Sequence, residues 1–463
     1  MPADQILTAA QMRSAEGDLI AAGSSVDALM QVAGRGAADW VWRAAAGRPV
    51  SVLCGPGNNG GDGYVIAEAL RERGGAVAVI AAVEPSTDAA RNARALYRGE
   101  VMGPDATPLG VVLVDCLFGS GLVRALAGDH VDLLTRLAAT HPLHIAIDLP
   151  SGVETDSCLP LNPGLPDYHL TLALGAWKYA HFLMPGAAGM GALRLVEIGV
   201  GAVPGAAKVL ARPCLYPPAS DAHKYRRGLL GVIGGAMPGA ALLACRSAQG
   251  AGAGYVKLLG GGACNAPPDI VVDAAPLVEA LKDPRFSLLV GPGLRRDAAA
   301  RETLSAVLTA ERPTVLDADA LILLRKVDLS GRRAALIATP HEGELAALEA
   351  AFSLSSTGTK PDRARALAQA SGMVIVAKGP DSVIAAPDGR TVLAPRASSW
   401  LSTAGTGDVL AGAIASRLAN GADAFSAACQ GLWLHTEAAR LAGAAFTASK
   451  LAGEVARAYA ACL

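Results

Sequence analysis

Short apolar runs alternate with helical patterns along most of this chain, and that alternation limits the folds it can adopt. In the first half the expected strands are residues 50–54, 76–82, 111–115 and 144–148, and the expected helices are 25–42 and 64–73. This order favours right-handed strand–helix–strand crossovers and a mainly parallel sheet. Ligands of such sheets bind beyond the carboxyl ends of the strands, so the loops after Cys54, Val114 and Ile147 should lie together.

The alternation stops once and then resumes. Residues 202–222 contain four prolines and no period, which is typical of an irregular connection. We therefore predict two α/β domains, 1–205 and 223–463, joined by a linker at 206–222. In the second domain the expected elements are strands at 229–233, 287–290, 313–316, 335–339 and 373–378, a helix at 239–252 and a nearly all-helical end at 407–461.

The composition excludes several classes of function. The 463 residues include 40 basic and 41 acidic side chains, which gives no electrostatic footprint for nucleic acid or for an anionic membrane. The uncharged stretch 228–245 is interrupted by Gly234, Gly235 and Pro238, which favours a strand and a helix over a membrane span. The eight cysteines form no C-x-x-C pair and the N-terminus shows no signal peptide. We expect a cytoplasmic protein that forms a homo-oligomer.

Two segments rich in glycine and aspartate stand near opposite ends of the chain: GPGNNGGDG at 55–63 and GTGDVLAG at 405–412. Each is expected to be a loop between a strand, or an extended run ending near Ala404, and a helix. Free N–H groups and a helix N-terminus then face an anion such as phosphate. A carboxylate there repels the phosphate and is costly unless it has chemistry to do. Asp62 and Asp408 are therefore candidate acid/base residues.

Three loops of the first domain carry oxygen donors. The first contains Asn59, the second begins at Asp115 and the third contains Ser151. Carboxylate, carbonyl and hydroxyl oxygens suit a hard cation. One such loop alone would more often be a plain turn. Three at one sheet edge favour a site.

The segments GPGNNGGDGYVIAEAL, VVDCLFGSGLV, HIAIDLPSGVETD and LMQVAG resemble the NAD(P)HX epimerase (YjeF N-terminal) domain over most of residues 1–205. The resemblance implies a Rossmann-like three-layer αβα fold that interconverts the R and S forms of hydrated NAD(P)H and binds K⁺. It implies K⁺ ligands at Asn59, Asp115 and Ser151. It implies substrate-binding positions at Asn58, Asn59, Gly60, Gly61, Gly119, Ser120, Gly121, Leu122, Val123, Arg124 and Asp148.

The proton carrier for epimerisation is not decided by the sequence. A positioned carboxylate can move the proton while the ring carbon loses and regains its hydroxyl. Asp62 is the first choice and Asp148 the second. Lys178 and His181 match a lysine and a histidine of the family, with packing roles equally open.

The second domain places Asp408 at a helix start, where backbone N–H groups of 404–407 can form an oxyanion pocket and Asp408 can accept a proton. Together with GGAMPGA, GPGL, LDADAL, ATPHEGELAAL and AKGPDSVIAA, this segment resembles the ADP/ATP-dependent NAD(P)H-hydrate dehydratase domain over about 215–463, with a ribokinase-like fold. The resemblance implies a catalytic Asp408. It implies hydrate- or nucleotide-binding positions at Ala240, Gly293, His341, Lys378, Gly379, Pro380, Asp381, Ser382 and Gly407.

One position departs from that pattern. The family usually has His-Lys-Gly near the domain start, whereas this chain has His223, Lys224 and Tyr225. The change puts His223 and Lys224 in doubt as ligands and suggests an altered flap over the substrate.

The resemblance implies that the hydrate hydroxyl attacks the terminal phosphoryl group of ADP or ATP, with Mg²⁺ on the phosphates, and that phosphate then leaves. We expect ADP, with NADHX and NADPHX as substrates. The rival functions are a ribokinase-class small-molecule kinase and a non-catalytic dinucleotide-binding protein. A kinase would release a stable phosphorylated product, and a mere binder would gain nothing from Asp62 and Asp408.

Overall fold

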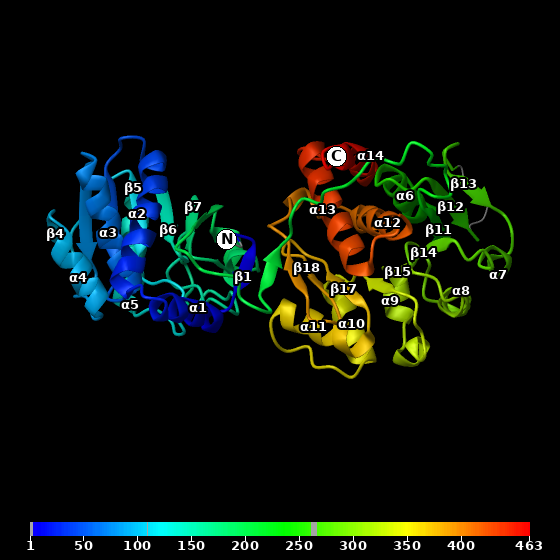
Figure 1. The fold of residues 1–463 in the computed structure, drawn as a ribbon, viewed down its shortest axis with the longest axis horizontal. Coiled ribbons are helices and arrows are strands. Elements are labelled where there is room, and N and C mark those ends of the chain that lie inside the picture. The colour runs from blue at the N-terminus through cyan, green and yellow to red at the C-terminus, as the bar shows by residue number, and fades with distance from the viewer. Residues whose placement is uncertain (1–2, 109, 261–265) are drawn as a thin grey trace. The chain divides into compact units, whose positions relative to one another are not determined.

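The structure, a computed structural model, describes residues 3–108, 110–260 and 266–463. The chain divides into two compact units, Met1–Lys208 and Val209–Leu463, and each is described by itself (Figure 1). None of the helices in the described ranges combines the length and the apolarity that a bilayer crossing requires.

The first unit is built on a seven-stranded parallel sheet with the order β4-β3-β2-β5-β6-β7-β9. Its strands are β2 (Val50–Cys54), β3 (Val77–Ala81), β4 (Val101–Met102), β5 (Val112–Cys116), β6 (Leu143–Ile147), β7 (Leu170–Leu174) and β9 (Ala192–Val196). The chain turns outward in opposite directions from β2 and β5. This is the strand order of a dinucleotide-binding fold, and ligands bind where the order reverses.

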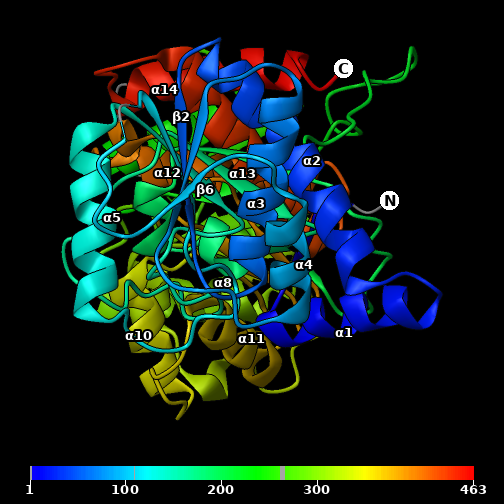
Figure 2. The ribbon, with the colours of Figure 1, turned by 90° about the vertical axis from the view of Figure 1, so that its left-hand side faces the viewer.

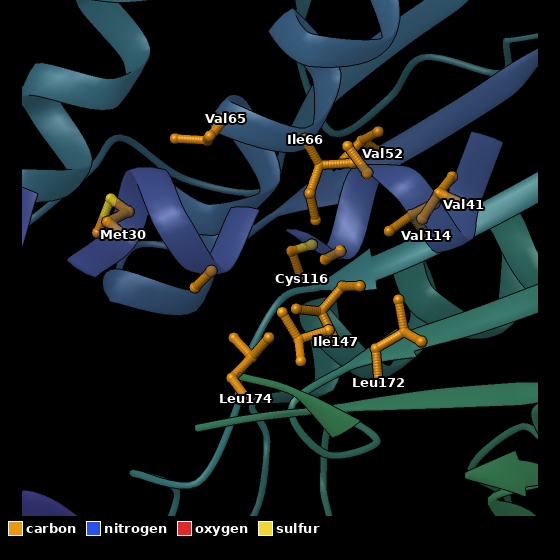
Figure 3. Close-up of a cluster of buried hydrophobic side chains, with 14 of the residues drawn as sticks. Met30, Val41, Val52, Val65, Ile66, Val114, Cys116, Ile147, Leu172 and Leu174 are labelled. Carbon is orange, nitrogen blue, oxygen red and sulfur yellow. The ribbon is translucent and has the colours of Figure 1, made fainter. Parts of the chain in front are cut away.

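Helices cover both faces of this sheet, which confirms the predicted αβα layers. Figure 2 shows α5 (Gly128–Thr140) on one face and α2 (Val26–Ala45), α3 (Asn58–Glu72) and α4 (Asp88–Leu96) on the other. The side chains of β2 alternate accordingly. Val52 packs into the core under α2 and α3 (Figure 3), whereas Leu53 packs into the core under α5.

Three short strands lie outside the seven-stranded sheet. Strand β1 (Gln5–Leu7) pairs in parallel with β8 (Trp177–Lys178) and antiparallel with β10 (Ala207–Val209), and α1 (Ala9–Ala21) follows β1. The predicted linker 206–222 therefore contains the whole of strand β10. Leu215, further along it, is buried against the C-terminal helices and donates its N–H to the carbonyl of Cys462.

The second unit contains nine strands, in the order β13-β12-β11-β14-β15-β16-β17-β18-β19, among its described residues. They are β11 (Leu229–Ile233), β12 (Tyr255–Leu259), β13 (Val271–Asp273), β14 (Phe286–Val290), β15 (Thr314–Leu316), β16 (Leu336–Ala338), β17 (Val374–Ala377), β18 (Val383–Ala385) and β19 (Thr391–Leu393). All pairs are parallel except β17–β18 and β18–β19. The order reverses between β11 and β14, as it does between β2 and β5.

The helices of the second unit are α6 (Pro238–Gly250), α7 (Leu277–Ala280), α8 (Ala298–Thr309), α9 (Asp319–Leu323), α10 (Glu342–Ala351), α11 (Lys360–Ser371), α12 (Thr406–Ala419), α13 (Ala424–Ala442) and α14 (Ala448–Ala460). A shared apolar core joins α6, α12 and α13 to one face of the sheet. The α/β class and the parallel sheets were predicted correctly.

Two predicted loops have a different local structure. Helix α3 begins at Asn58, so most of the first glycine segment is helical and Asp62 lies inside the helix. Its glycines permit close packing: a Cβ on Gly63 would stand 2.7 Å from Sγ of Cys54. The run before Asp408 is not extended either, because residues Ser399–Leu401 form a 3-10 turn.

Candidate active sites

The loops after β2, β5 and β6 meet at the carboxyl edge of the first sheet, as predicted. Gly119 marks the meeting point, because a Cβ there would stand 3.1 Å from Oδ2 of Asp148 and 3.2 Å from Cγ of Asn59. The predicted binding positions 119–124 form a turn in which Leu122 donates its N–H to the carbonyl of Gly119. Gly121, Val123 and Arg124 are exposed there.

Asp148 lies at the centre of this first site and is buried. Its Oδ2 accepts the Ser120 N–H at 2.9 Å, and its Oδ1 accepts a hydrogen bond from Nζ of Lys178 at 2.5 Å. Burial alone would raise the pKa of Asp148, but the Lys178 ammonium and the hydrogen bonds from Lys178 and Ser120 lower it to about 2. This carboxyl is therefore an anion at neutral pH.

The pKa of Asp62 is shifted in the opposite direction. Asp62 is buried in α3, and no hydrogen bond to its carboxyl is seen within the described residues. Burial, followed by the charges of Asp148 and Glu16, raises its pKa well above the usual value, and Lys178 offsets only part of this. Two neighbouring carboxyls whose pKa values are shifted in opposite directions are suited to acid and base roles.

Glu16, on α1, is a site residue that the sequence did not indicate. Burial raises the pKa of its carboxyl, and the charges of Lys178 and Asp148 also act on it. Glu16 belongs to no glycine motif and to no strand end. Only the packing of α1 brings it near the site, so the sequence offered no signal for it.

Two of the three predicted cation ligands, Asp115 and Ser151, are in direct contact. Ser151 donates its hydroxyl to Oδ1 of Asp115 at 2.7 Å, and Tyr168 donates its hydroxyl to Oδ2 of Asp115 at 2.5 Å. The N–H groups of Leu117 and Ser151 also reach this carboxylate, so its four lone-pair positions are filled. Asn59 is different, because its Oδ1 is buried and has no hydrogen-bond donor.

The second site lies at the corresponding edge of the second sheet. The loops after β11 and β14 touch where the strand order reverses, since a Cβ on Gly235 would overlap the carbonyl oxygen of Gly293. Gly293 has φ +68°, and its carbonyl accepts the N–H of Met237 at 3.1 Å. The predicted positions Ala240 and Gly293 therefore belong to the two strand-end segments that flank this point.

Acidic groups gather around Lys378, which follows β17: Asp317 follows β15, and Glu344 and Asp408 lie in the first turns of α10 and α12. Nζ of Lys378 donates to Oδ1 of Asp317 at 2.7 Å and lies 3.6 Å from Oε2 of Glu344. Thr339 donates its hydroxyl to the same Asp317 oxygen at 2.6 Å. Burial lowers the pKa of Lys378, but the charges of Asp317, Glu344 and Asp408 outweigh burial and raise it. The Lys378 side chain is therefore a cation surrounded by the carboxyl groups of Asp317, Glu344 and Asp408.

Asp408 occupies the first turn of α12, as predicted, next to Gly405 in the left-handed conformation. Burial and the nearby charge of Asp317 raise the pKa of Asp408 to about 6, although the charge of Lys378 acts in the opposite direction. A carboxyl that titrates near neutrality suits a general base. His435 supports the turn by a 3.0 Å hydrogen bond from Nε2 to the carbonyl of Thr406.

The remaining predicted residues of the second site sit at strand ends. His341 caps α10, because its Nδ1 accepts the N–H of Gly343 at 3.0 Å, and its side chain is exposed. Ser382 closes the turn after β17 with a 2.8 Å hydrogen bond to the carbonyl of Gly379. Asp381 pairs with Lys360, a residue that the sequence did not single out, and Pro380 is exposed.

His223 and Lys224 lie elsewhere. The Lys224 ammonium stacks over Tyr255, the first residue of β12, and Tyr225 contacts the same ring. These contacts are at the amino ends of the strands, whereas the second site is at their carboxyl ends. The structure thus supports the doubt about both residues as ligands, and Tyr225 forms no flap over that edge.

No cluster of three or more His, Cys, Asp or Glu side chains suited to a metal ion is found within the described ranges. The potassium set predicted for the first site contains only one acid and is not tested by this finding.

Two family models match the chain. The model of the YjeF-related protein N-terminus matches residues 26–180, and the model of NAD(P)H-hydrate dehydratase matches residues 230–460. The first match contains the loops of the first site, and the second contains Asp408 and Lys378.

Relatives of similar length resemble the chain along nearly its whole sequence. The bifunctional NAD(P)H-hydrate repair enzyme Nnr of Salinibacter ruber is 32% identical, over 95% of this chain and 92% of its own. The Nnr enzyme of Mycobacterium leprae is 34% identical, over 94% and 93%. Among solved structures, the ADP/ATP-dependent NAD(P)H-hydrate dehydratase of Bacillus subtilis, co-crystallised with ATP/Mg²⁺, is 27% identical, covers 54% of this chain and 95% of its own, and has a TM-score of 0.46.

The sequence identities to the two relatives and the matches to the two family models point to the same family. The chain belongs to the family of bifunctional NAD(P)H-hydrate repair enzymes, which combine an epimerase with a dehydratase.

Proposed function

We propose that the first unit epimerises hydrated NAD(P)H with Asp62 as the proton carrier. The protonated carboxyl of Asp62 gives its proton to the ring hydroxyl, the C–O bond breaks, and water leaves as the ring nitrogen's lone pair forms a C=N bond. Water then adds to the opposite face of that carbon and returns a proton to Asp62. The raised pKa of Asp62 beside the lowered pKa of Asp148 carries this proposal.

Asp148 has a separate task in this scheme. Its negative charge stabilises the positive charge that develops on the ring when the hydroxyl leaves. The turn 119–124, held by the Ser120 N–H, and the first turn of α3 with Asn58, Asn59, Gly60 and Gly61 would bind the phosphates, because N–H groups at a helix N-terminus attract anions.

K⁺ at this site is part of the proposal. The oxygens of Asn59 and Ser151 suit it: Oδ1 of Asn59 is buried without a donor, and the Ser151 hydroxyl keeps one lone pair. Asp115 would supply the compensating negative charge through its hydrogen bond with Ser151, because its own lone pairs are already occupied. When bound, K⁺ would reduce the repulsion between the substrate phosphates and the carboxylates of Asp115 and Asp148. Epimerisation should therefore require KCl and fail when choline chloride replaces it.

In the second unit, Asp408 accepts the proton of the hydrate hydroxyl while that oxygen attacks the terminal phosphoryl group of ADP or ATP. The phosphate then leaves as the ring nitrogen's lone pair forms a C=N bond, and loss of a proton from the adjacent ring carbon to water gives NAD(P)H. Lys378 and the N–H groups at the start of α12 stabilise the transferring group. Mg²⁺ would neutralise charge on the nucleotide. It needs only one or two protein carboxylates besides phosphate oxygens, and Asp317 would supply one.

One experiment tests both assignments. Resolved S- and R-hydrates of NADH are incubated with the full chain, with ADP or with ATP, and absorbance at the NADH band is followed. The S-hydrate should be consumed at once, and the R-hydrate should be consumed only as fast as the first unit converts it. A stable phosphorylated hydrate without NADH would instead indicate a kinase. We propose ADP as the better co-substrate, so faster turnover with ATP would contradict that part.

We also propose a homo-oligomer in a reducing cytoplasm. The cysteines in the described ranges form no disulfide bonds, as is usual for proteins of reducing compartments. Light scattering of the full chain tests the assembly, and a monomer at micromolar concentration would contradict it.

A further inference from the structure

We propose that Lys178 and His181 are positioning residues of the first site, which together hold Asp148 in the conformation that faces the turn 119–124. The inference rests on the proposed epimerisation and assigns a task to two residues that the sequence left open.

The backbone of Asp148 needs such support. Its φ is +65°, in the left-handed region that a residue with a side chain seldom adopts. That conformation is less favourable than ordinary backbone for a residue with a side chain. Leu172 accepts the Asp148 N–H at 2.7 Å on one side, and His181 contacts the Asp148 carbonyl through Nε2 at 2.8 Å on the other.

The tautomer of His181 follows from its second contact. Its Nδ1 accepts the backbone N–H of Lys178 at 2.9 Å, so Nδ1 carries no hydrogen and Nε2 must carry one. His181 therefore donates to the Asp148 carbonyl. The histidine is buried, and a proton on Nδ1 would oppose the Lys178 N–H, so the ring serves as a fixed neutral donor.

Lys178 holds the other end of Asp148. Its side chain is 1% exposed, and its ammonium donates to Oδ1 of Asp148 at 2.5 Å and to the carbonyl of Leu174 at 2.6 Å. With Oδ1 held by Lys178 and Oδ2 held by the Ser120 N–H, the plane of the carboxylate is fixed. The contacts of Lys178 and His181 with Asp148 come from one short segment, since Lys178 ends β8 and His181 ends the 3-10 turn Tyr179–His181 that follows it.

The position of this arrangement argues against simple packing. A buried ion pair gives little net stability, because each charge loses its water. Here the pair sits beside Asp62 and Glu16, at the sheet edge where the predicted substrate loops meet. The anion that Lys178 fixes is the one that also holds the N–H of the substrate turn.

The test separates kcat from KM for epimerisation in the full chain. Lys178→Met removes the ammonium at similar volume, and Lys208→Met, an exposed lysine of the same unit, is the control. We expect about a 100-fold loss of kcat for Lys178→Met, with KM changed less than threefold, because a misplaced catalytic group costs about that much. Dehydration of the S-hydrate by the same chain should stay unchanged.

The two histidine variants separate positioning from bulk. His181→Gln can keep a donor near the Nε2 position, whereas His181→Phe fills the space without one. We expect His181→Gln to retain at least a tenfold higher kcat than His181→Phe. Equal losses in the two variants, or a Lys178→Met kcat within threefold of the unaltered chain, would overturn the inference.

A readout without catalysis makes the result independent of the proposed function. Hydrogen exchange of the Ser120 amide, read from the segment 119–124, should speed up at least tenfold in Lys178→Met and stay constant in Lys208→Met, with exchange in α12 unaffected. Unchanged exchange would overturn the inference. Loss of all epimerisation in the unaltered chain would instead overturn the proposed function. Should Lys178→Met fail to fold, the His181 variants decide the question by the same two measurements.

Discussion

Gly55 lies directly against the backbone of Leu117, so closely that a Cβ carbon at position 55 would overlap the Leu117 carbonyl oxygen. The two residues follow β2 and β5 at the point where the strand order of the first sheet reverses. We predict that Gly55→Ala lowers the free energy of unfolding of the first unit by about 2–3 kcal/mol, because two backbones must separate. Gly57→Ala is the control, since open space surrounds that position. Denaturant unfolding measures the free energy of unfolding of both variants. Equal losses in the two variants would contradict the close backbone contact between Gly55 and Leu117.

Asp62 gives a prediction that couples stability to activity. Its pKa is raised in the folded chain, so the folded state holds this proton more tightly than the unfolded state does, and stability falls as pH rises above the unfolded value near 4. Asp62→Asn removes that cost. We expect Asp62→Asn to raise the melting temperature more at pH 8 than at pH 4.5 while it abolishes epimerisation and leaves dehydration intact. Asp132→Asn, on the exposed side of α5, should change neither property.

The strands and their edges could be predicted because their signal is local. Val50–Cys54 and Leu229–Ile233 match the structure to the residue, since an apolar run bounded by glycine or proline has few alternatives. The start of α3 could not be predicted so well. A run of glycines favours a loop by propensity, yet here the missing side chains let α3 pack against Cys54 and Gly55.

The site residues divide in the same way. Asp148, Lys378 and Asp408 follow strands or begin a helix within glycine motifs, so their position could be predicted from the chain alone. Glu16 and Tyr168 could not, because each reaches the first site only through the tertiary packing of a separate segment. The protonation of Asp62 also depends on burial and on neighbours far away in sequence.

His435 predicts how the second unit responds to acid. It is buried against the Thr406 carbonyl, and burial lowers its pKa to about 4. The unfolded chain binds this proton near pH 6.5, so stability is lost as pH falls from 6.5 toward 4, by about 2 kcal/mol at pH 5. Calorimetry at pH 7 and pH 5 should show that His435→Gln loses less stability between them than the unaltered chain. His223→Gln, at an exposed position, should behave like the unaltered chain.

Asp317 should set the pH dependence of dehydration through Asp408. The pKa of Asp408 is about 6, raised by burial and by the charge of Asp317, so activity should fall below that pH as the base becomes protonated. Asp317→Asn removes the charge and releases Lys378 from its 2.7 Å hydrogen bond, and both changes favour the ionised form of Asp408. We therefore expect the acid limb of kcat/KM to move to lower pH in Asp317→Asn.

Asp319→Asn is the control for this prediction. Asp319 is two residues away and paired with Arg296, so its substitution should leave the acid limb in place. We expect Asp408→Asn to remove dehydration altogether while epimerisation continues. If instead the acid limb is unchanged in Asp317→Asn and Asp408→Asn retains dehydration activity, Asp408 is not the base.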